Sequence, residues 1–178
     1  MNILTKLFLG LVFALAAGPM ALAEDESSLK GHDTEAPINF VADRLELNDE
    51  EHYAVFIGSV VATQGDLKFM TESLRVFYEN EPGEENPTAV RLDAIGHIRL
   101  ESPTESAEGN WGIYDVKSRT ITIGGDVILR REGSVITAQR LEIDLITGLT
   151  KFDGLPFDST TGERSRVTGS FDPPDDSK

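Results

Sequence analysis

The clearest pattern in the chain is a run of alternating apolar and polar positions that occurs twice. The first copy covers residues 53–77 and the second covers residues 120–144; aligning Gly58 with Gly125 sets the shift at 67 positions (125 − 58). Each copy consists of an apolar strand, a glycine, a second apolar strand, a polar turn and two further strand segments. A strand unit repeated at a fixed period indicates stacked copies that bury one shared apolar seam. The repeat therefore predicts an all-β fold built from a duplicated strand-turn-strand unit.

A change of parity inside each copy predicts that the strands bend. The apolar positions are odd at Leu67 and Phe69 but even at Leu74, and the second copy reverses its parity at the equivalent place. Because side chains of a strand alternate between its two faces, this change requires a bend or bulge, which we place at residues 71–73 and 138–140. Strands that turn at the same place in each copy wrap around a lumen, so we expect a rolled β structure.

Polar segments separate the strands that the alternation predicts. Residues 81–87 hold two prolines, which break any strand, and residues 102–110 form a second acidic, polar loop. Between these loops, residues 89–100 resemble half of the repeat unit around a third glycine, Gly96. No stripe of 3.6-residue period runs for more than two turns after the N-terminal apolar segment, so we expect strands and no helices.

The first residues predict a signal peptide. Lys6 precedes an uncharged apolar stretch at residues 7–17, and Ala21-Leu22-Ala23 gives the small-x-small pattern of a cleavage site. A retained membrane anchor is the alternative, but the apolar run is short for a span of about 20 residues. We therefore expect an exported protein from which residues 1–23 are removed.

The domain organisation that we expect has four parts. They are a cleaved signal peptide at residues 1–23, a flexible arm at residues 24–36, a β domain at residues 37–156 and a polar tail at residues 157–178. Within the tail, residues 164–171 could add one edge strand. A mature chain of this size makes one domain with a full hydrophobic core.

The composition limits the classes of function. The formal net charge is −15 at pH 7, with 31 acidic against 16 basic residues. Sequence-independent nucleic-acid binding needs a clustered basic face, which this sequence does not have, so we expect no nucleic-acid partner. The absence of cysteine excludes a disulfide scaffold, a thiol nucleophile and thiolate metal sites.

No sequence pattern typical of catalysis or metal binding occurs. The histidines His32, His52 and His97 are isolated, with no two at metal-ligand spacing, and the sequence has neither a nucleophile elbow nor a phosphate-binding glycine loop. Parallel β-helix polysaccharide lyases are the enzymes to weigh, because they also stack strands. They are much longer and carry clustered charges in their clefts. We expect no enzyme activity, no cofactor and no metal.

The apolar face of the predicted roll has two interpretations. Its residues can fill a closed core, or they can line an open lumen that receives an apolar ligand, as in ligand-binding barrels. The residues alone slightly favour a closed core. In an open roll, the same side chains would largely serve both purposes.

Four segments occur in a characteristic order and spacing: Pro37–Asp43, Phe56–Gly65, Ile121–Leu129 and Ile136–Asp144. In this order they resemble the LptA/OstA family of periplasmic lipopolysaccharide-transport proteins, and the resemblance covers residues 36–152. It implies a twisted, slightly open antiparallel β-jellyroll (OstA-like). Trp111 and the doubled glycine at 124–125 are not required by the family pattern.

The resemblance also implies a function in outer-membrane biogenesis. The protein would be a periplasmic carrier, or bridge, for lipopolysaccharide between the inner and outer membranes, with lipid A acyl chains sheltered in an apolar lumen. Its terminal strands would pair edge to edge with jellyroll domains of the inner-membrane and outer-membrane transport components, and head-to-tail with other copies of itself. Because lipopolysaccharide is anionic too, the binding free energy would come from acyl burial, about 0.8 kcal/mol per CH₂.

The same resemblance assigns the lumen positions. Two of them, Ile38 and Phe40, belong to the N-terminal edge strand, which also meets the partner domain. The full set is Ile38, Phe40, Phe56, Val60, Leu67, Phe69, Leu74, Val76, Leu100, Ile123, Val127, Leu129, Ile136, Leu141 and Ile143.

Three alternatives differ from such a carrier. A sister component of the transport system would keep a membrane anchor, and the outer-membrane translocon carries a long barrel after this module. A secreted β-roll with a closed core would be a protein-interaction or carbohydrate-binding module. Carbohydrate binding calls for exposed aromatic residues on a flat face, and the chain has one Trp and three Tyr.

Overall fold

The computed structural model contains strands and no helix among the residues that it describes, which are 29–80, 83, 87–155 and 165–171. None of these residues belongs to a helix long and apolar enough to cross a membrane. The expected signal peptide at residues 1–23 lies outside the described residues. So do residues 24–28 of the expected arm and most of the expected tail.

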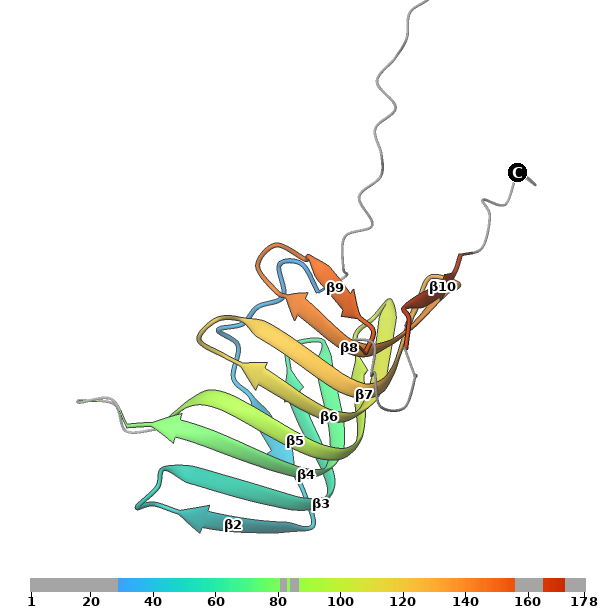
Figure 1. Ribbon diagram of the computed structural model, residues 1–178. Coiled ribbons are helices and arrows are strands. Elements are labelled where there is room, and N and C mark those ends of the chain that lie inside the picture. The colour runs from blue at the N-terminus through green and yellow to red at the C-terminus, as the bar shows by residue number, and fades with distance from the viewer. Residues whose placement is uncertain (1–28, 81–82, 84–86, 156–164, 172–178) are drawn as a thin grey trace, which may run out of the picture.

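Ten strands form one antiparallel sheet within the described residues (Figure 1). They are β1 (Asn39–Val41), β2 (Arg44–Asn48), β3 (Tyr53–Gln64), β4 (Leu67–Glu79), β5 (Thr88–Glu101), β6 (Glu105–Asp115), β7 (Thr120–Arg131), β8 (Ser134–Asp144), β9 (Thr150–Asp153) and β10 (Thr168–Ser170). The order along the sheet is β1-β3-β4-β5-β6-β7-β8-β10, with β2 also on β3 and β9 also on β8. The all-β prediction is confirmed.

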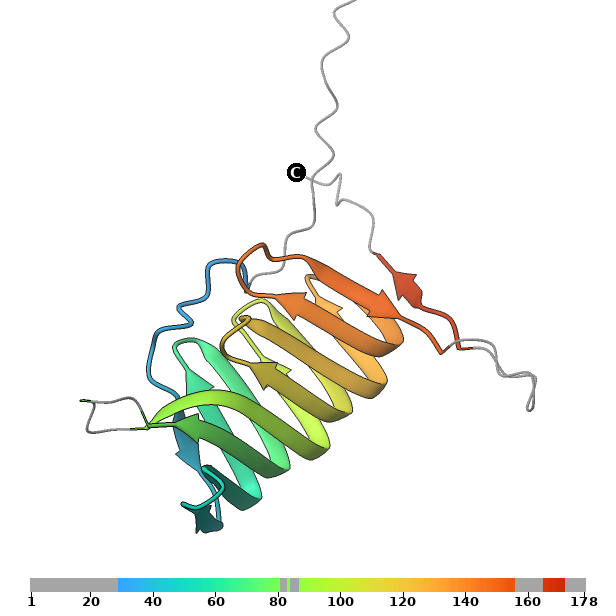
Figure 2. The same ribbon diagram turned by 60° about the vertical axis from the view of Figure 1, so that its left-hand side comes forward.

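Each long strand turns a corner, so the single sheet folds into two facing halves (Figures 1 and 2). The first part of β3 pairs with β2, whereas its last part pairs with β1. At the other end of the sheet, the first part of β8 pairs with β10 and its last part pairs with β9. Each end of the folded sheet therefore carries two edge strands, one from each half.

The corner is built by pairs of residues in the left-handed backbone region on alternate strands. These pairs are Gly58-Ser59 on β3, Gly96-His97 on β5 and Gly125-Asp126 on β7, with glycine φ angles of 82°, 89° and 78°. Each pair lies in a register shift, where two residues face one residue of the next strand. Such a bulge bends a strand and strengthens its twist, which is how a sheet closes around an interior.

The predicted bends at residues 71–73 and 138–140 are confirmed in position, but the extra residues lie on the neighbouring strands. Glu72 of β4 faces the glycine pair of β3, and Gln139 of β8 faces that of β7. On β4 and β8, which have only one residue at the corner, the inward-facing positions must change from odd to even numbers or the reverse. This explains why Leu67 and Leu74 are both buried although they differ in parity.

The loop predicted at residues 102–110 is wrong for most of its length, because β6 begins at Glu105. The inward positions of this part of the strand hold Glu105 and Ala107, which are both buried. A carboxylate and a small side chain at the inward positions remove the apolar signal by which a strand is recognised. The sheet pairs these residues on both sides, so tertiary context determines their structure.

The doubled glycine at 124–125 has two separate roles. Gly125 belongs to the corner, whereas Gly124 pairs with Trp111 across β6 and β7, and a Cβ on Gly124 would overlap the indole ring. The indole lies over this position on the outside of the sheet, where Trp111 is partly exposed. The first glycine therefore makes room for the aromatic ring, and the second allows the bend.

Replacing a corner glycine should cost more stability than replacing a turn glycine. In Gly125→Ala, the new Cβ would lie 3.0 Å from the Cβ of Asn110, and the residue would keep a positive φ. We expect a loss of about 2–3 kcal/mol in the free energy of unfolding, measured by urea denaturation. Gly65→Ala is the control, because its φ is also positive but its nearest neighbour, His32, lies 3.7 Å away. Equal losses would show that only the backbone angle matters at the corner.

Candidate functional site

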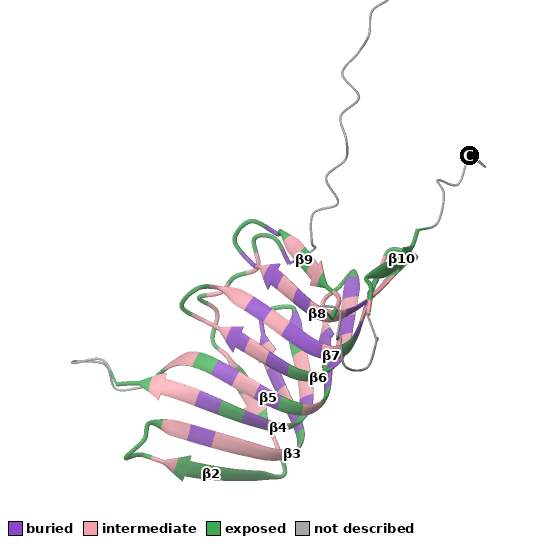
Figure 3. Ribbon diagram, viewed as in Figure 1, coloured by how far each residue is buried: buried purple, intermediate pink, exposed green. Residues whose placement is uncertain are grey.

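The interior between the two halves of the sheet holds one apolar cluster among the described residues. Buried positions recur along the long strands that surround it (Figure 3). Every lumen position assigned from the sequence lies in this cluster or against it. The buried ones are Val60, Leu67, Leu74, Val76, Leu100, Ile123, Val127, Leu129, Leu141 and Ile143, and the partly buried ones are Ile38, Phe40, Phe56, Phe69 and Ile136. Their contact with a lipid stays a prediction.

Several interior residues were missed by the sequence analysis. They are Leu29, Ala62, Leu92, Ala94, Ile98, Ala107, Tyr114, Ile121 and Leu145. Within residues 92–100, every even-numbered position holds an apolar side chain or glycine. These inward positions could have been assigned from that alternation. Leu29 and Leu145 lie outside any strand, so no alternation marks them.

The interior is open at the N-terminal end of the fold. A hollow of about 950 Å³ lies there, between β1, β2, β3, β4 and the start of β5. Its apolar lining includes Ile38, Phe40, Leu45, Leu47, Phe56 and Val76. The rings of Phe40 and Phe56 stack with their centroids 4.7 Å apart. We call this hollow the mouth.

Beyond the mouth, side chains fill the interior. The pocket next to the mouth holds only about 30 Å³ and is lined by residues such as Ala62, Phe69 and Tyr114. That is the volume of about one water molecule. Further along, Leu141 and Ile143 on β8 have no exposed surface. The mouth is therefore open, whereas the C-terminal part of the interior is packed as a core.

Two polar groups lie inside the fold near the opening between its halves. Gln64, at the end of β3, is only 4% exposed, and its Oε1 accepts a hydrogen bond of 3.0 Å from the hydroxyl of Tyr114 on β6. Burial raises the pKa of the Tyr114 hydroxyl, which keeps this donor neutral. The bond joins the free ends of the two halves across the opening.

Glu105 and Arg131 form a second buried polar pair. The Nε of Arg131 lies 2.6 Å from Oε2 of Glu105, and the two side chains are 10% and 4% exposed. Arg131 lies 67 positions after Gln64, so the two residues occupy equivalent places in the duplicated unit. Each copy thus ends its second strand with a buried polar side chain.

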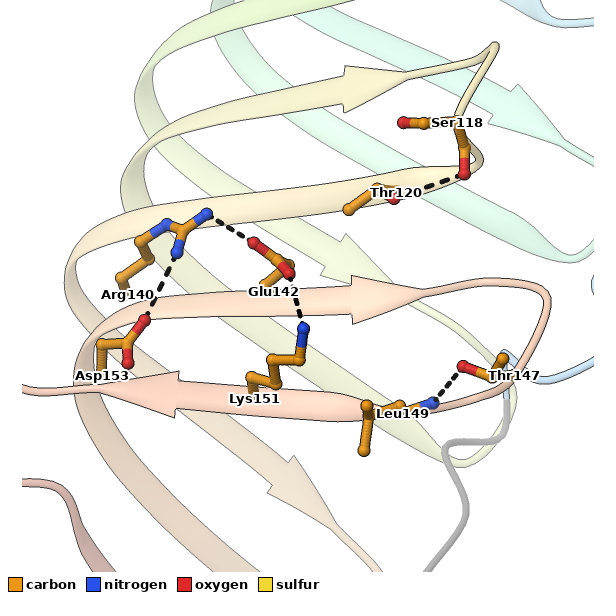
Figure 4. Close-up of polar contacts among 8 residues, drawn as sticks. All are labelled: Ser118, Thr120, Arg140, Glu142, Thr147, Leu149, Lys151 and Asp153. Carbon is orange, nitrogen blue, oxygen red and sulfur yellow. Dashed lines mark hydrogen bonds and ion pairs between the residues drawn. The ribbon is translucent and has the colours of Figure 1, made fainter.

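Most other charged groups lie on the outer faces of the strands. On β8 and β9, Arg140 pairs with Glu142 and Asp153, and Lys151 also reaches Glu142 (Figure 4). Hydrogen bonds from Lys151 and Arg140 lower the pKa of the Glu142 carboxyl. Exposed pairs of this kind contribute little stability, about 0–1 kcal/mol each.

The described residues contain no group of three or more His, Asp or Glu side chains that could hold a metal ion. The three histidines make three unrelated contacts. His32 contacts Gln64, His97 binds Glu72 at the corner, and the ring of His52 packs edge-on against Tyr78.

Comparisons with known proteins find related sequences. The model of the family described as "LptA/(LptD N-terminal domain) LPS transport protein" matches residues 39–149. An uncharacterized protein of Rhizobium meliloti (strain 1021) is 29% identical over 121 residues, which cover 66% of this chain and 65% of that protein. The chain therefore spans slightly less than two thirds of this relative.

A second relative is the lipopolysaccharide export system protein LptH of Pseudomonas aeruginosa. It is 25% identical over 169 residues, which cover 78% of this chain and 92% of LptH. The crystal structure of LptH, described as the LptA-homologous periplasmic component of the lipopolysaccharide transport device, superposes with a TM-score of 0.66 and 22% identity. The superposition covers 80% of this chain and 99% of LptH. The shared fold confirms the predicted open antiparallel β-jellyroll.

Proposed function

The chain belongs to the LptA/(LptD N-terminal domain) family of lipopolysaccharide transport proteins, and on that premise we propose that it carries lipopolysaccharide across the periplasm. In this proposal the lipid A acyl chains enter the apolar interior, and the sugar head group stays in water. The protein bridges the inner and outer membranes, and residues 1–23 are removed on export. It performs no catalysis, so transport is driven by other components.

The observation that carries this proposal is the apolar mouth. Its volume is about 950 Å³, and it leads into an interior lined by the cluster described above. Apolar surface open to water at one end of a packed interior is a favourable place for acyl chains, since each buried methylene contributes about 0.8 kcal/mol. The rim cations Lys117 and Arg119 already pair with Glu79 and Glu35, so in this proposal the binding free energy comes from acyl burial and not from the head group.

The exposed sheet edges support the proposed partners. At the N-terminal end, Val41, Leu45 and Leu47 are exposed on β1 and β2, and β9 and β10 end the sheet at the other side. An unpaired edge offers backbone donors and acceptors to another strand. We propose that jellyroll domains of the inner-membrane and outer-membrane components pair with these edges, as do further copies of this chain. The expected domain at residues 37–156 is the unit that would be joined in this way.

Photo-crosslinking in cells tests the proposal. A photoreactive amino acid replaces Phe56 or Phe69 inside, or Lys68 as the control on the outer face of the same sheet. We expect lipopolysaccharide adducts from both inner positions, with more from Phe56 because it lines the mouth. No adduct is expected from Lys68. A folded, exported protein that yields no adduct from Phe56 or Phe69 would instead favour an interaction module with a closed core.

A further inference from the structure

Residues 29–38 form a strap along the open side of the folded sheet (Figure 2). The strap begins beside the turn between β8 and β9 and runs to β1 at the other end of the sheet (Figures 1 and 2). It contains no strand residues, so it adds no ladder to either half. It therefore covers the gap between the free ends of the two halves without being part of the sheet.

The first end of the strap is anchored in the core. Leu29 is only 3% exposed and belongs to the apolar cluster, in a pocket with Leu129 and Ile143. The backbone N–H of Gly31 donates to the carbonyl of Leu145 at 3.3 Å. An apolar side chain of the strap thus occupies interior space at the C-terminal end of the fold.

The middle of the strap is held by Gln64. Its Nε2 donates hydrogen bonds of 2.9 Å to the carbonyls of both Thr34 and Ala36. Its Oε1 lies 3.2 Å from Nε2 of His32, and it also accepts the bond from Tyr114. Burying an amide in an apolar interior is unfavourable unless the amide is hydrogen-bonded, and here most of its bonds go to the strap. Gln64 therefore acts as a latch that ties the strap to the bridge between the two halves.

We propose that the strap is a displaceable lid, closed in the empty protein and moved aside when acyl chains enter through the open side. This inference rests on the proposed function. The pocket beside Ile38 and Gln64, next to the mouth, has room for about one water molecule. An acyl chain that extends past the mouth at this point therefore needs space that opens only if the strap moves. Moving the strap breaks the contacts of Gln64 and Leu29, the hydrogen bond between Gly31 and Leu145 and the ion pair between Glu35 and Arg119, but none of the sheet ladders.

The first test weakens the latch in the full-length exported protein. Gln64→Leu removes both carbonyl contacts and leaves an apolar side chain of similar size. We expect fluorescently labelled lipopolysaccharide to associate about tenfold faster and bind about tenfold more tightly, because more of the empty protein is open. Tyr114→Phe removes only the hydroxyl that holds Gln64 and should act in the same direction, more weakly. Unchanged or weaker binding in both variants would overturn the proposal.

The second test locks the strap. The natural chain has no cysteine, so Lys30→Cys/Gly148→Cys gives a single pair that can be oxidised. A Cβ on Gly148 would lie 2.8 Å from the Cβ of Lys30, about 1 Å closer than in a disulfide, so the turn must widen slightly and the new cysteine must keep the positive φ of 74°. We expect oxidation to slow the association of labelled lipopolysaccharide at least tenfold and reduction to restore it. Equal rates for the oxidised and reduced protein would contradict a moving strap.

A third measurement needs no lipid. Ala62→Cys places a thiol in the small pocket beneath the strap, and Ala138→Cys places one at a buried position near the corner. Adding Gln64→Leu should speed the reaction of the first thiol with a thiol reagent about tenfold and leave the second unchanged. If the wild-type protein binds no lipopolysaccharide, the proposed function fails and this reaction alone decides whether the strap opens. Equal acceleration at both positions would mean that Gln64→Leu loosens the whole fold, and it would overturn the proposal that the strap moves.

Discussion

Phe56→Asp should lower the affinity for lipopolysaccharide about 100-fold and leave the protein folded. Phe56 is half-buried in the mouth, where its ring stacks on Phe40. An aspartate there faces water when the protein is empty, so the fold can accept it. A bound acyl chain would cover the carboxylate and remove its hydration, which we expect to cost about 3 kcal/mol of binding free energy.

Ile95→Asp is the matched control for this prediction. Ile95 is 70% exposed on the outer face of β5, so the same change of an apolar residue to aspartate meets no ligand there. Titration of both variants with labelled lipopolysaccharide, with circular dichroism as the check of folding, measures the difference. Similar affinities for the two variants would mean that acyl chains do not contact the mouth. The interior would then be a plain core.

The duplicated unit could be predicted from the sequence because its information is local. Alternation marks the inward face of each strand, and a reversal of parity can only be met by a bend. Glycine at the equivalent place in each copy lies at this corner, on β3 and β7, where Gly58 and Gly125 adopt positive φ. The lumen positions were assigned from the family resemblance. Most of them also lie on strands that the repeat defines, whereas Ile38, Phe40 and Leu100 lie outside both copies.

The strap could not be predicted, because no periodic pattern in the sequence indicates its contacts. Residues 29–36 are polar and were expected to form part of a flexible arm, yet Leu29 is buried and the backbone of Thr34 and Ala36 binds Gln64. Carbonyl groups are present at every residue, so a bond to them leaves no trace in the sequence. Only the position of a buried amide, fixed by the fold, selects which carbonyls it meets.

Breaking the buried pair of Glu105 and Arg131 should have the largest effect on stability. Glu105→Leu keeps the volume of the side chain but removes the carboxylate, so the guanidinium of Arg131 stays inside the protein without that partner. We expect the free energy of unfolding to fall by about 3–5 kcal/mol in urea denaturation. The matched control is Glu79→Leu. Its carboxylate pairs with Lys117 at a site where both side chains are more than half exposed, and its loss should cost less than about 1 kcal/mol.

The double variant Glu105→Leu/Arg131→Leu separates two explanations of that loss. If the cost comes from the loss of the Glu105 carboxylate beside the Arg131 charge, removing Arg131 as well should recover most of the stability, because an apolar pair of similar volume suits this interior. If the cost comes from lost packing, the double variant should be at least as unstable as the single one. Recovery would also fit the duplicated unit, since Gln64 holds the equivalent place in the first copy without any charge. The ion pair would then be one of two ways in which the same position keeps a buried polar group satisfied.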